Sequence, residues 1–305
     1  MYDRILFPTD GSEPAASVLD YAVAIAGEHG ATLHVLTVAD TGQDTITRLE
    51  EDVVDALEGE GRRIVEEAAA RASDRGVSVV TEVLRGDPHE RIVGYAGQVG
   101  ADCIVMPTHG RRGLRRLLLG SVTERVINTA PVPVVAINPG RERALDYPPD
   151  DVLVPTDGSS AATLALRNGV QLAEATAATL HLLNVIETGS LGPDARSLLK
   201  QGDLSDRADE IIAEAVETAE AASLDPHTSV VEHSEPARAI REYIEDNGID
   251  LAVLGTQGTT NFSRYVLGGV AAKLVRTAPV PVMWVRKPDS EGEESEAVPD
   301  SPGET

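Results

Sequence analysis

Short, continuous apolar runs alternate along the chain with longer segments whose apolar residues recur at helical spacing. The runs have the length and β-branched content of strands covered on both sides, and the longer segments have one apolar face. In the first half the pattern predicts strands at residues 3–8, 31–38, 77–83, 101–106 and 132–137. It predicts helices at residues 15–29, from 46 to near 76, at 88–99 and at 121–129.

The second half of the chain repeats the pattern of the first half. ILFPTDGS at residues 5–12 returns as VLVPTDGS at 152–159, and TLHVL at 32–36 returns as TLHLL at 179–183, both at an offset of 147 residues. TAPVPV at 129–134 returns at 277–282. A period this long exceeds a solenoid repeat, so each copy is expected to be a domain with its own core.

A segment with prolines and a glycine separates the two copies. Residues 138–150 hold three prolines and a glycine, which is typical of a linker. Residues 288–305 contain seven acidic residues and no basic one, which indicates a disordered, solvated tail. The expected units are domain 1 at residues 1–140, domain 2 at 150–287 and the tail at 288–305.

Strands that alternate with helices indicate an α/β fold with a parallel sheet and helices on both faces, a doubly wound, Rossmann-like arrangement. Pro133 and Pro281 fall inside the predicted last strands, and proline cannot donate to a strand ladder, so these strands are expected at sheet edges. Edges so apolar would aggregate unless paired. The last strand of the other copy is the simplest partner.

Composition narrows the class of protein. With 26 basic and 50 acidic residues the net charge is −24, which disfavours nucleic-acid or anionic-membrane partners. No membrane-spanning run or leader pattern is evident, so a cytoplasmic protein is expected. Only three basic residues are lysine, and an acidic, lysine-poor composition suits high intracellular salt, which predicts a halophile; an ordinary acidic protein is the alternative. The lone Cys103 lies in an apolar strand and is expected to be inert core.

The loop after the fourth predicted strand has the chemistry of an anion site. Gly110 and Gly120 allow close backbone approach, and the next helix would present its first amides and positive end to a phosphate. Ser121 is expected to cap this helix in a capping box with Glu124, and the Ser121 and Thr123 hydroxyls to donate to phosphate. Four arginines, 111, 112, 115 and 116, form the densest basic cluster; some are expected near phosphate, the alternative being a solvated face.

Several short motifs, taken together in their order along the chain, resemble those of a known protein family. The PTDGS turn after strand one, GDPHE at residues 86–90, the Gly110 to Gly120-Ser121 spacing and the closing APVPVV together resemble the universal stress protein family. The resemblance covers about 280 residues, as two complete copies. It implies a five-stranded parallel sheet of order 3-2-1-4-5 in each copy and dimerisation through the last strands, which a tandem chain would satisfy within itself, with a homodimer as a further expectation.

The resemblance also implies a site for ATP or AMP, with Mg²⁺ only as part of the bound nucleotide. The acid after strand one would lie at the adenine–ribose end and a valine ending strand two would touch adenine. The expected nucleotide contacts in copy one are Pro8, Thr9, Asp10, Val38, Thr108, Gly110, Arg111, Gly120, Ser121, Val122 and Thr123. Those in copy two are Pro155, Thr156, Asp157, Val185, Gly255, Gly258, Thr259, Gly268, Gly269 and Val270.

Each copy departs from the family motif. Copy one has Pro107 where the first glycine is expected, which removes a backbone donor and fixes φ. Copy two keeps its glycines but has Gly269 in place of the hydroxyl residue and Ala271 in place of Thr123. A lost hydroxyl–phosphate hydrogen bond costs about 1 kcal/mol.

Other residues have weaker chemical readings. Asp10 and Asp157 can each form an Asx turn with the following Gly-Ser as well as face a ligand. His34 and His181 recur on strand two and are expected to be packed side chains, and His109 is not repeated in copy two.

Three functions compete. The first is a non-catalytic or weakly hydrolytic adenine-nucleotide switch in stress response. The second is an adenylating enzyme on a similar fold, disfavoured because PTDGS replaces the phosphate loop of such enzymes. The third is a structural or interaction protein with one or both pockets degenerate.

Overall fold

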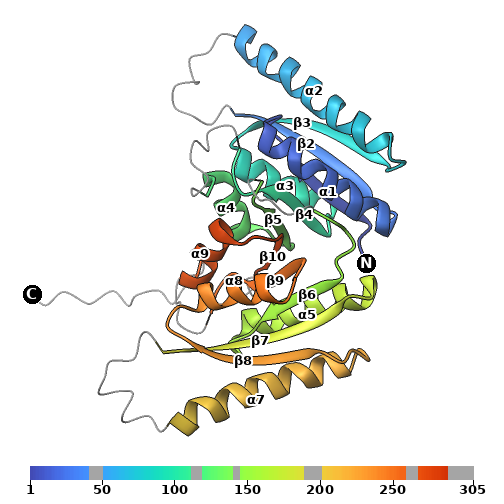
Figure 1. Cartoon of the computed structure of the whole chain (residues 1–305). Helices are drawn as coiled ribbons and strands as arrows, with labels where there is room; N and C mark the ends of the chain where they lie inside the picture. The colour runs from blue at the N-terminus through green and yellow to red at the C-terminus, as the bar shows by residue number, and fades with distance from the viewer. Residues whose placement is uncertain (41–50, 111–118, 140–144, 189–200, 259–266, 288–305) are drawn as a thin grey trace, which may run out of the picture.

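The described residues form one ten-stranded sheet in the order β3-β2-β1-β4-β5-β10-β9-β6-β7-β8. The structure, a computed structural model, describes residues 1–40, 51–110, 119–139, 145–188, 201–258 and 267–287. The two halves of the sheet are the two copies of the sequence, and they meet in the middle of the molecule (Figure 1). The predicted order 3-2-1-4-5 is confirmed in the first copy and recurs in the second as β8-β7-β6-β9-β10.

The elements follow the predicted alternation. Copy one contains β1 (Arg4–Pro8), α1 (Glu13–His29), β2 (Thr32–Asp40), α2 (Glu51–Ser73), β3 (Val79–Gly86), α3 (Pro88–Val99), β4 (Cys103–Pro107), α4 (Ser121–Thr129) and β5 (Val134–Ile137). Copy two contains β6 (Asp151–Pro155), α5 (Ser160–Thr176), β7 (Thr179–Glu187), α7 (Gln201–Glu220), β8 (His227–His233), α8 (Pro236–Asp246), β9 (Leu251–Gly255), α9 (Gly269–Thr277) and β10 (Val282–Val285).

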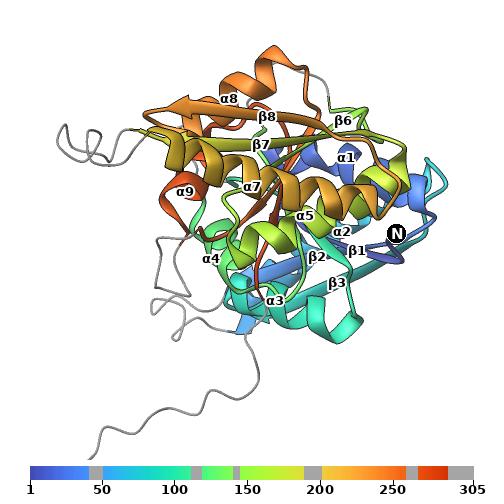
Figure 2. The same cartoon turned by 90° about the horizontal axis from the view of Figure 1, so that it is seen from below.

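Helices cover both faces of the sheet, and each face has a core that runs through both copies. One core joins the sheet to α1, α2, α5 and α7, and the other joins it to α3, α4, α8 and α9. Two views show α7 lying over β7 and β8 (Figure 1 and Figure 2). Strands buried on both sides explain the continuous apolar runs of the sequence.

The last strands of the two copies pair with each other. β5 and β10 run antiparallel, with Val135 opposite Met283 and Val134 opposite Trp284, whereas the other strand pairs are parallel. The two strands begin one residue after Pro133 and Pro281, later than the predicted start at residue 132. Each proline carbonyl still accepts from the neighbouring strand, Pro133 from Ile104 N at 3.0 Å. Proline can accept but not donate, so it lies just before the strand instead of inside it.

The linker is anchored on copy one. The Tyr147 hydroxyl lies 2.6 Å from His29 Nε2, and the Tyr147 ring packs edge-on against Tyr21. Residues 140–144 and the predicted tail at 288–305 lie outside the described residues. None of the described helices is long and apolar enough to cross a lipid bilayer.

Candidate functional site

The order of the strands reverses next to β1. β1 lies between β2 and β4, and the helices that follow β1 and β4 pack on opposite faces of the sheet. The loops that leave the two strands must therefore separate, and ligands of doubly wound sheets bind where this happens. We call this part of each copy the switch-point edge: residues 8–12, 107–110 and the start of α4 in copy one, and residues 155–159, 255–258 and the start of α9 in copy two.

The turn after β1 is held by its own side chains. Asp10 Oδ1 accepts from Ser12 N at 3.0 Å, and Thr9 Oγ1 accepts from Gly11 N at 3.2 Å. Ser12 then caps α1 by accepting from Ala15 N at 3.3 Å. The Asx-turn interpretation of Asp10 is confirmed, and Gly11 supplies the positive φ of 70° that this turn requires.

Copy two repeats the turn bond for bond. Asp157 Oδ1 accepts from Ser159 N at 3.0 Å, Thr156 Oγ1 accepts from Gly158 N at 3.3 Å, and Ser159 caps α5. Pro8 and Pro155 end the preceding strands, β1 and β6. The motif PTDGS is therefore a strand end, a turn and a helix cap in both copies.

The carboxylate of this turn lies against the loop that leaves the fourth strand of its copy. A Cβ atom on Gly110 would overlap with Asp10 Oδ2, and one on Gly258 would lie 2.7 Å from Asp157 Oδ2. Glycine suits these two positions because any other residue would make the carboxylate move aside. The structure thus brings together the acid and the glycine that the sequence places 100 residues apart.

The loop of copy one closes before α4. Gly120 N donates to Thr108 O at 2.8 Å, and buried Thr123 donates its hydroxyl to Pro107 O at 2.9 Å. The Thr123 hydroxyl thus braces the end of β4 in this structure, and its donation to phosphate stays a prediction. Proline at 107 leaves its carbonyl available as the acceptor.

The start of α4 also differs from the prediction. Gly120 is the N-cap residue and makes no side-chain capping bond, so the predicted capping box of Ser121 with Glu124 is wrong. Ser121 and Val122 instead lie in the first turn, where backbone N–H groups have no acceptor within the helix. Glycine as the cap leaves these donors without a side-chain partner from its own position.

The same loop in copy two closes alike but is packed differently at its first position. Gly268 N donates to Thr256 O at 3.0 Å and is the N-cap residue of α9, whose first turn contains Gly269 and Val270. A Cβ atom on Gly255 would lie 2.8 Å from the backbone carbonyl carbon of Ala161, in the first turn of α5. Gly255 therefore serves helix packing, a role that Pro107 cannot share.

The valines expected near adenine lie one strand further along. Val38 and Val185 are partly buried near the ends of β2 and β7 and pack against the core of α3, α4, α8 and α9. Arg111, the other arginines of its cluster and Thr259 lie outside the described residues.

The histidines behave as packed side chains, as expected for His34 and His181. Both are buried, and their Nδ1 atoms lie 3.2 and 3.1 Å from the hydroxyls of Tyr95 and Tyr243. Burial lowers the pKa of His34 and of His109, which favours neutral rings. Cys103 is also buried, and burial raises the pKa of its thiol.

Sequence reasoning missed two polar residues beside these turns. Thr37 and Asn184 are buried, and each donates to the backbone carbonyl of the residue before the acid. The available signal was a polar residue at the same place in both copies of an otherwise apolar strand.

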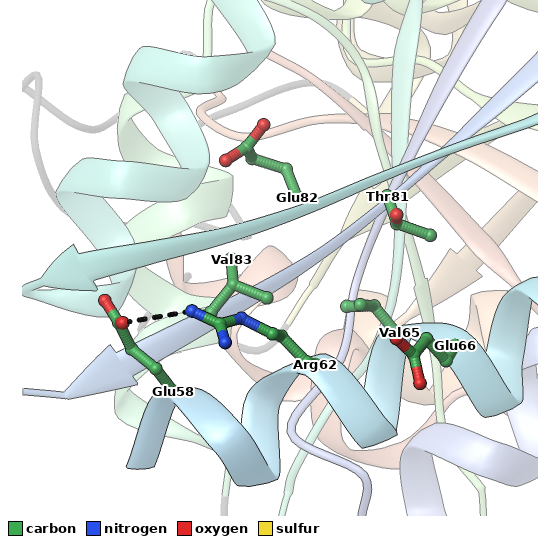
Figure 3. A pocket seen from close by; sticks show the side chains of 7 residues that line it. All are labelled: Glu58, Arg62, Val65, Glu66, Thr81, Glu82 and Val83. Atoms are coloured by element: carbon green, nitrogen blue, oxygen red, sulfur yellow. Dashed lines mark ion pairs between the residues drawn. The ribbon is translucent and has the colours of Figure 1, made fainter. Parts of the chain in front are cut away.

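A hollow elsewhere in copy one lies between α2 and the edge strand β3. It is lined by Glu58, Arg62 and Glu66 of α2 and by Thr81, Glu82 and Val83 of β3, and Glu58 pairs with Arg62 at 3.5 Å (Figure 3). This hollow is separate from the switch-point edge. Within the described ranges, no group of three or more His, Cys, Asp or Glu side chains is arranged to hold a metal ion.

Comparisons with known proteins match both copies. The sequence model of the universal stress protein family matches residues 1–138 and 149–286. Universal stress protein MJ0531 of Methanocaldococcus jannaschii is 37% identical over 140 residues, which are 45% of this chain and 82% of the relative. Universal stress protein Mb2028c of Mycobacterium bovis is 29% identical over 245 residues, 75% of this chain and 78% of the relative.

A solved structure has the same overall architecture. The crystal structure of a universal stress protein from Archaeoglobus fulgidus superposes with a TM-score of 0.69 at 25% identity, covering 93% of this chain and 98% of the other. With both copies matched in sequence and the paired fold matched in structure, the chain belongs to the universal stress protein family, with two family domains in tandem.

Proposed function

We propose that this protein binds an adenine nucleotide, ATP or AMP, at the switch-point edge of copy one and acts as a stress-response switch that hydrolyses ATP slowly or not at all. The observation that carries the proposal is the start of α4. The helix begins on Gly120 without a side-chain cap, and Gly120 lies against the backbone of Thr108 and His109. The next residue of that loop, Gly110, lies against the Asp10 carboxylate. Its open amides and positive end suit a phosphate.

The contrast with the neighbouring helix supports this assignment. α1 begins at the same edge, but Ser12 caps it and takes one of its free donors. In α4 the first-turn amides of Ser121, Val122 and Thr123 have no such cap. In a chain of net charge −24, an anion needs local donors of this kind.

Copy two is proposed as the weaker site. The copies differ at the first helical position by one hydroxyl, Ser121 against Gly269. Ala271 also replaces Thr123, whose hydroxyl donates to Pro107 O. One such hydrogen bond is worth about 1 kcal/mol, or about fivefold in affinity. Gly258 and Gly268 would still let the backbone approach a ligand, and the amide of Val270 lies in the first turn of α9.

The remaining expectations follow as parts of the same proposal. Pro8, Thr9 and Asp10 would face the adenine–ribose end with Val38, and Thr108, Gly110, Arg111 and Gly120 would face the phosphates, with any Mg²⁺ carried by the nucleotide. The paired last strands would let the two copies work as a pseudo-dimer, with homodimerisation a further step. We place the protein in the cytoplasm of a halophile, on composition alone.

A second function is favoured by one observation. The first turn of α5 packs against Gly255, and copy one has Pro107 at the matching position. Neither copy therefore uses the first position of the glycine motif as the family motif would. A structural or interaction protein with degenerate pockets would show this pattern.

Denaturing the purified protein in its native salt and measuring the released nucleotide separates the two functions. Near one ATP or AMP per chain is expected, together with a rise in melting temperature on adding Mg-ATP. Ser121→Ala should lower affinity about fivefold. Ser160→Ala is the matched control, because Ser160 also occupies the first helical position, in α5. No released nucleotide and no thermal shift would favour the structural alternative.

A further inference from the structure

The strand that leads into the acidic turn is fixed at its last peptide by a side chain from the next strand. Thr9 N continues the ladder by donating to Leu36 O at 2.8 Å. The carbonyl of Thr9 then accepts from Thr37 Oγ1 at 2.7 Å. A side-chain donor thus holds this carbonyl where β1 turns away from β2.

Copy two makes the same pair of bonds with a different residue. Thr156 N donates to Leu183 O at 2.8 Å, and Asn184 Nδ2 donates to Thr156 O at 2.8 Å. Thr37 and Asn184 are each only 5% exposed. A threonine hydroxyl and an asparagine amide differ in shape and volume, so what the two copies share is a buried donor aimed at one carbonyl.

Each of these donors therefore has a reason to be polar. A buried polar group without a partner costs free energy, and an apolar residue would fill the same space without that risk. Thr37 and Asn184 interrupt apolar strands, and in both copies the donor meets the residue directly before the acid. The hydrogen bond, not the filling of space, accounts for both residues.

The fixed carbonyl determines where the carboxylate lies. Asp10 follows Thr9 directly; its Oδ1 is held by Ser12 N, and its Oδ2 lies against Gly110. Because Asp10 Oδ2 lies against Gly110, a displacement of the turn changes the distance between the two loops of the switch-point edge.

We propose that Thr37 and Asn184 are positioning residues that fix the acidic turn against the glycine loop and so set the geometry of the ligand edge in each copy. They act through the turn without touching the ligand. The effect on affinity rests on the proposed nucleotide binding, whereas the effect on the turn does not.

Thr37→Val tests this in the full-length protein, because valine keeps the shape of threonine and removes the donor. Hydrogen exchange of the amides of residues 9–12 is expected to speed up at least tenfold. The Kd for Mg-ATP is expected to rise at least fivefold. Thr37→Asn, which installs the donor of copy two, should restore both to within threefold of the wild type.

Thr176→Val is the matched control, because Thr176 in α5 also donates its hydroxyl to a carbonyl at 2.8 Å, away from either turn. It should leave exchange at residues 9–12 unchanged. Should Thr37→Val fail to fold, Asn184→Leu with Asn184→Thr as rescue tests the same claim on residues 156–159.

The proposal is overturned if Thr37→Val exchanges within twofold of the wild type, if Thr37→Asn is as fast as Thr37→Val, or if exchange rises while the Kd for Mg-ATP stays the same. A wild type that binds neither Mg-ATP nor AMP removes the proposed nucleotide function alone. The exchange rates then decide whether Thr37 fixes the turn.

Discussion

In copy one β4 ends on Pro107, whose carbonyl accepts from the buried Thr123, whereas in copy two β9 ends on Gly255, against which the first turn of α5 packs. The turns after β1 and β6 match bond for bond, and Gly120 and Gly268 close their loops alike. The backbone arrangement of the switch-point edge is therefore the same in both copies, whereas the contacts at the ends of β4 and β9 differ. A glycine at a motif position can therefore serve the packing of a helix instead of the approach of a ligand.

The largest expected effect comes from replacing Gly255 or Pro107, the residues that end β9 and β4. Gly255→Ala places a Cβ atom 2.8 Å from backbone of Ala161, which cannot move without shifting α5, so we expect a loss of about 2–3 kcal/mol in the free energy of unfolding. Urea denaturation followed by the fluorescence of Trp284, the one tryptophan of the chain, measures it. Pro107→Ala in copy one is the control and should cost less than half as much. Equal losses would refute the distinction between the copies.

A smaller effect is expected where the copies agree. Gly110→Ala overlaps with Asp10 Oδ2, a side-chain atom that can rotate away, so we expect a loss of about 1–2 kcal/mol in stability. In an Asp10→Ala background the same change should be nearly neutral, since the overlapping atom is gone. The double-mutant cycle measures this coupling, and Gly258→Ala with Asp157→Ala repeats it in copy two. Additive losses in both copies would show that the acid does not explain the glycine.

The smallest effect concerns the pH dependence of stability. Burial, then the nearby N-terminal amine, lowers the pKa of His29 from its ordinary value of 6.5, and burial does the same for His34 and His109 in copy one. A lowered pKa of a base means that the folded state favours the neutral ring. The stability it contributes is complete above pH 6.5 and is lost as the pH falls through the folded-state pKa.

His29→Gln should therefore weaken the decline in unfolding free energy between pH 6.5 and 5, measured by urea denaturation at each pH. A decline unchanged by His29→Gln would show that His29 does not contribute to the pH dependence of stability.

Most of the fold was predictable because its signals are local. The helical spacing of apolar residues, with a proline at the start of α3, predicted the bounds of α3 and α4 correctly. The strand order was predicted through the family resemblance. Strand ends were harder: β2 continues to Asp40, beyond the predicted residue 38, because pairing with β3 extends to Gly86. Such pairing depends on a strand that is distant in sequence.

The site was predictable in its backbone and less so in its side chains. Asp10 and Gly110 meet as parts of one edge, but the cap at Ser121 was misplaced by one residue, and Thr123 faces the strand. A hydroxyl near a helix start has several acceptors within reach, and sequence spacing does not choose among them. Thr37 and Asn184 were missed for the same reason, since their partners are carbonyls, which any residue supplies.

The antiparallel join of β5 to β10 has a consequence for how the protein responds to its own abundance. Two separate single-domain chains meet through a bimolecular encounter and come apart on dilution, but here the two halves share one polypeptide and meet at a fixed effective concentration. The seam is therefore complete in a cell that holds a handful of molecules, and rising or falling expression changes how many units exist without changing what each unit is.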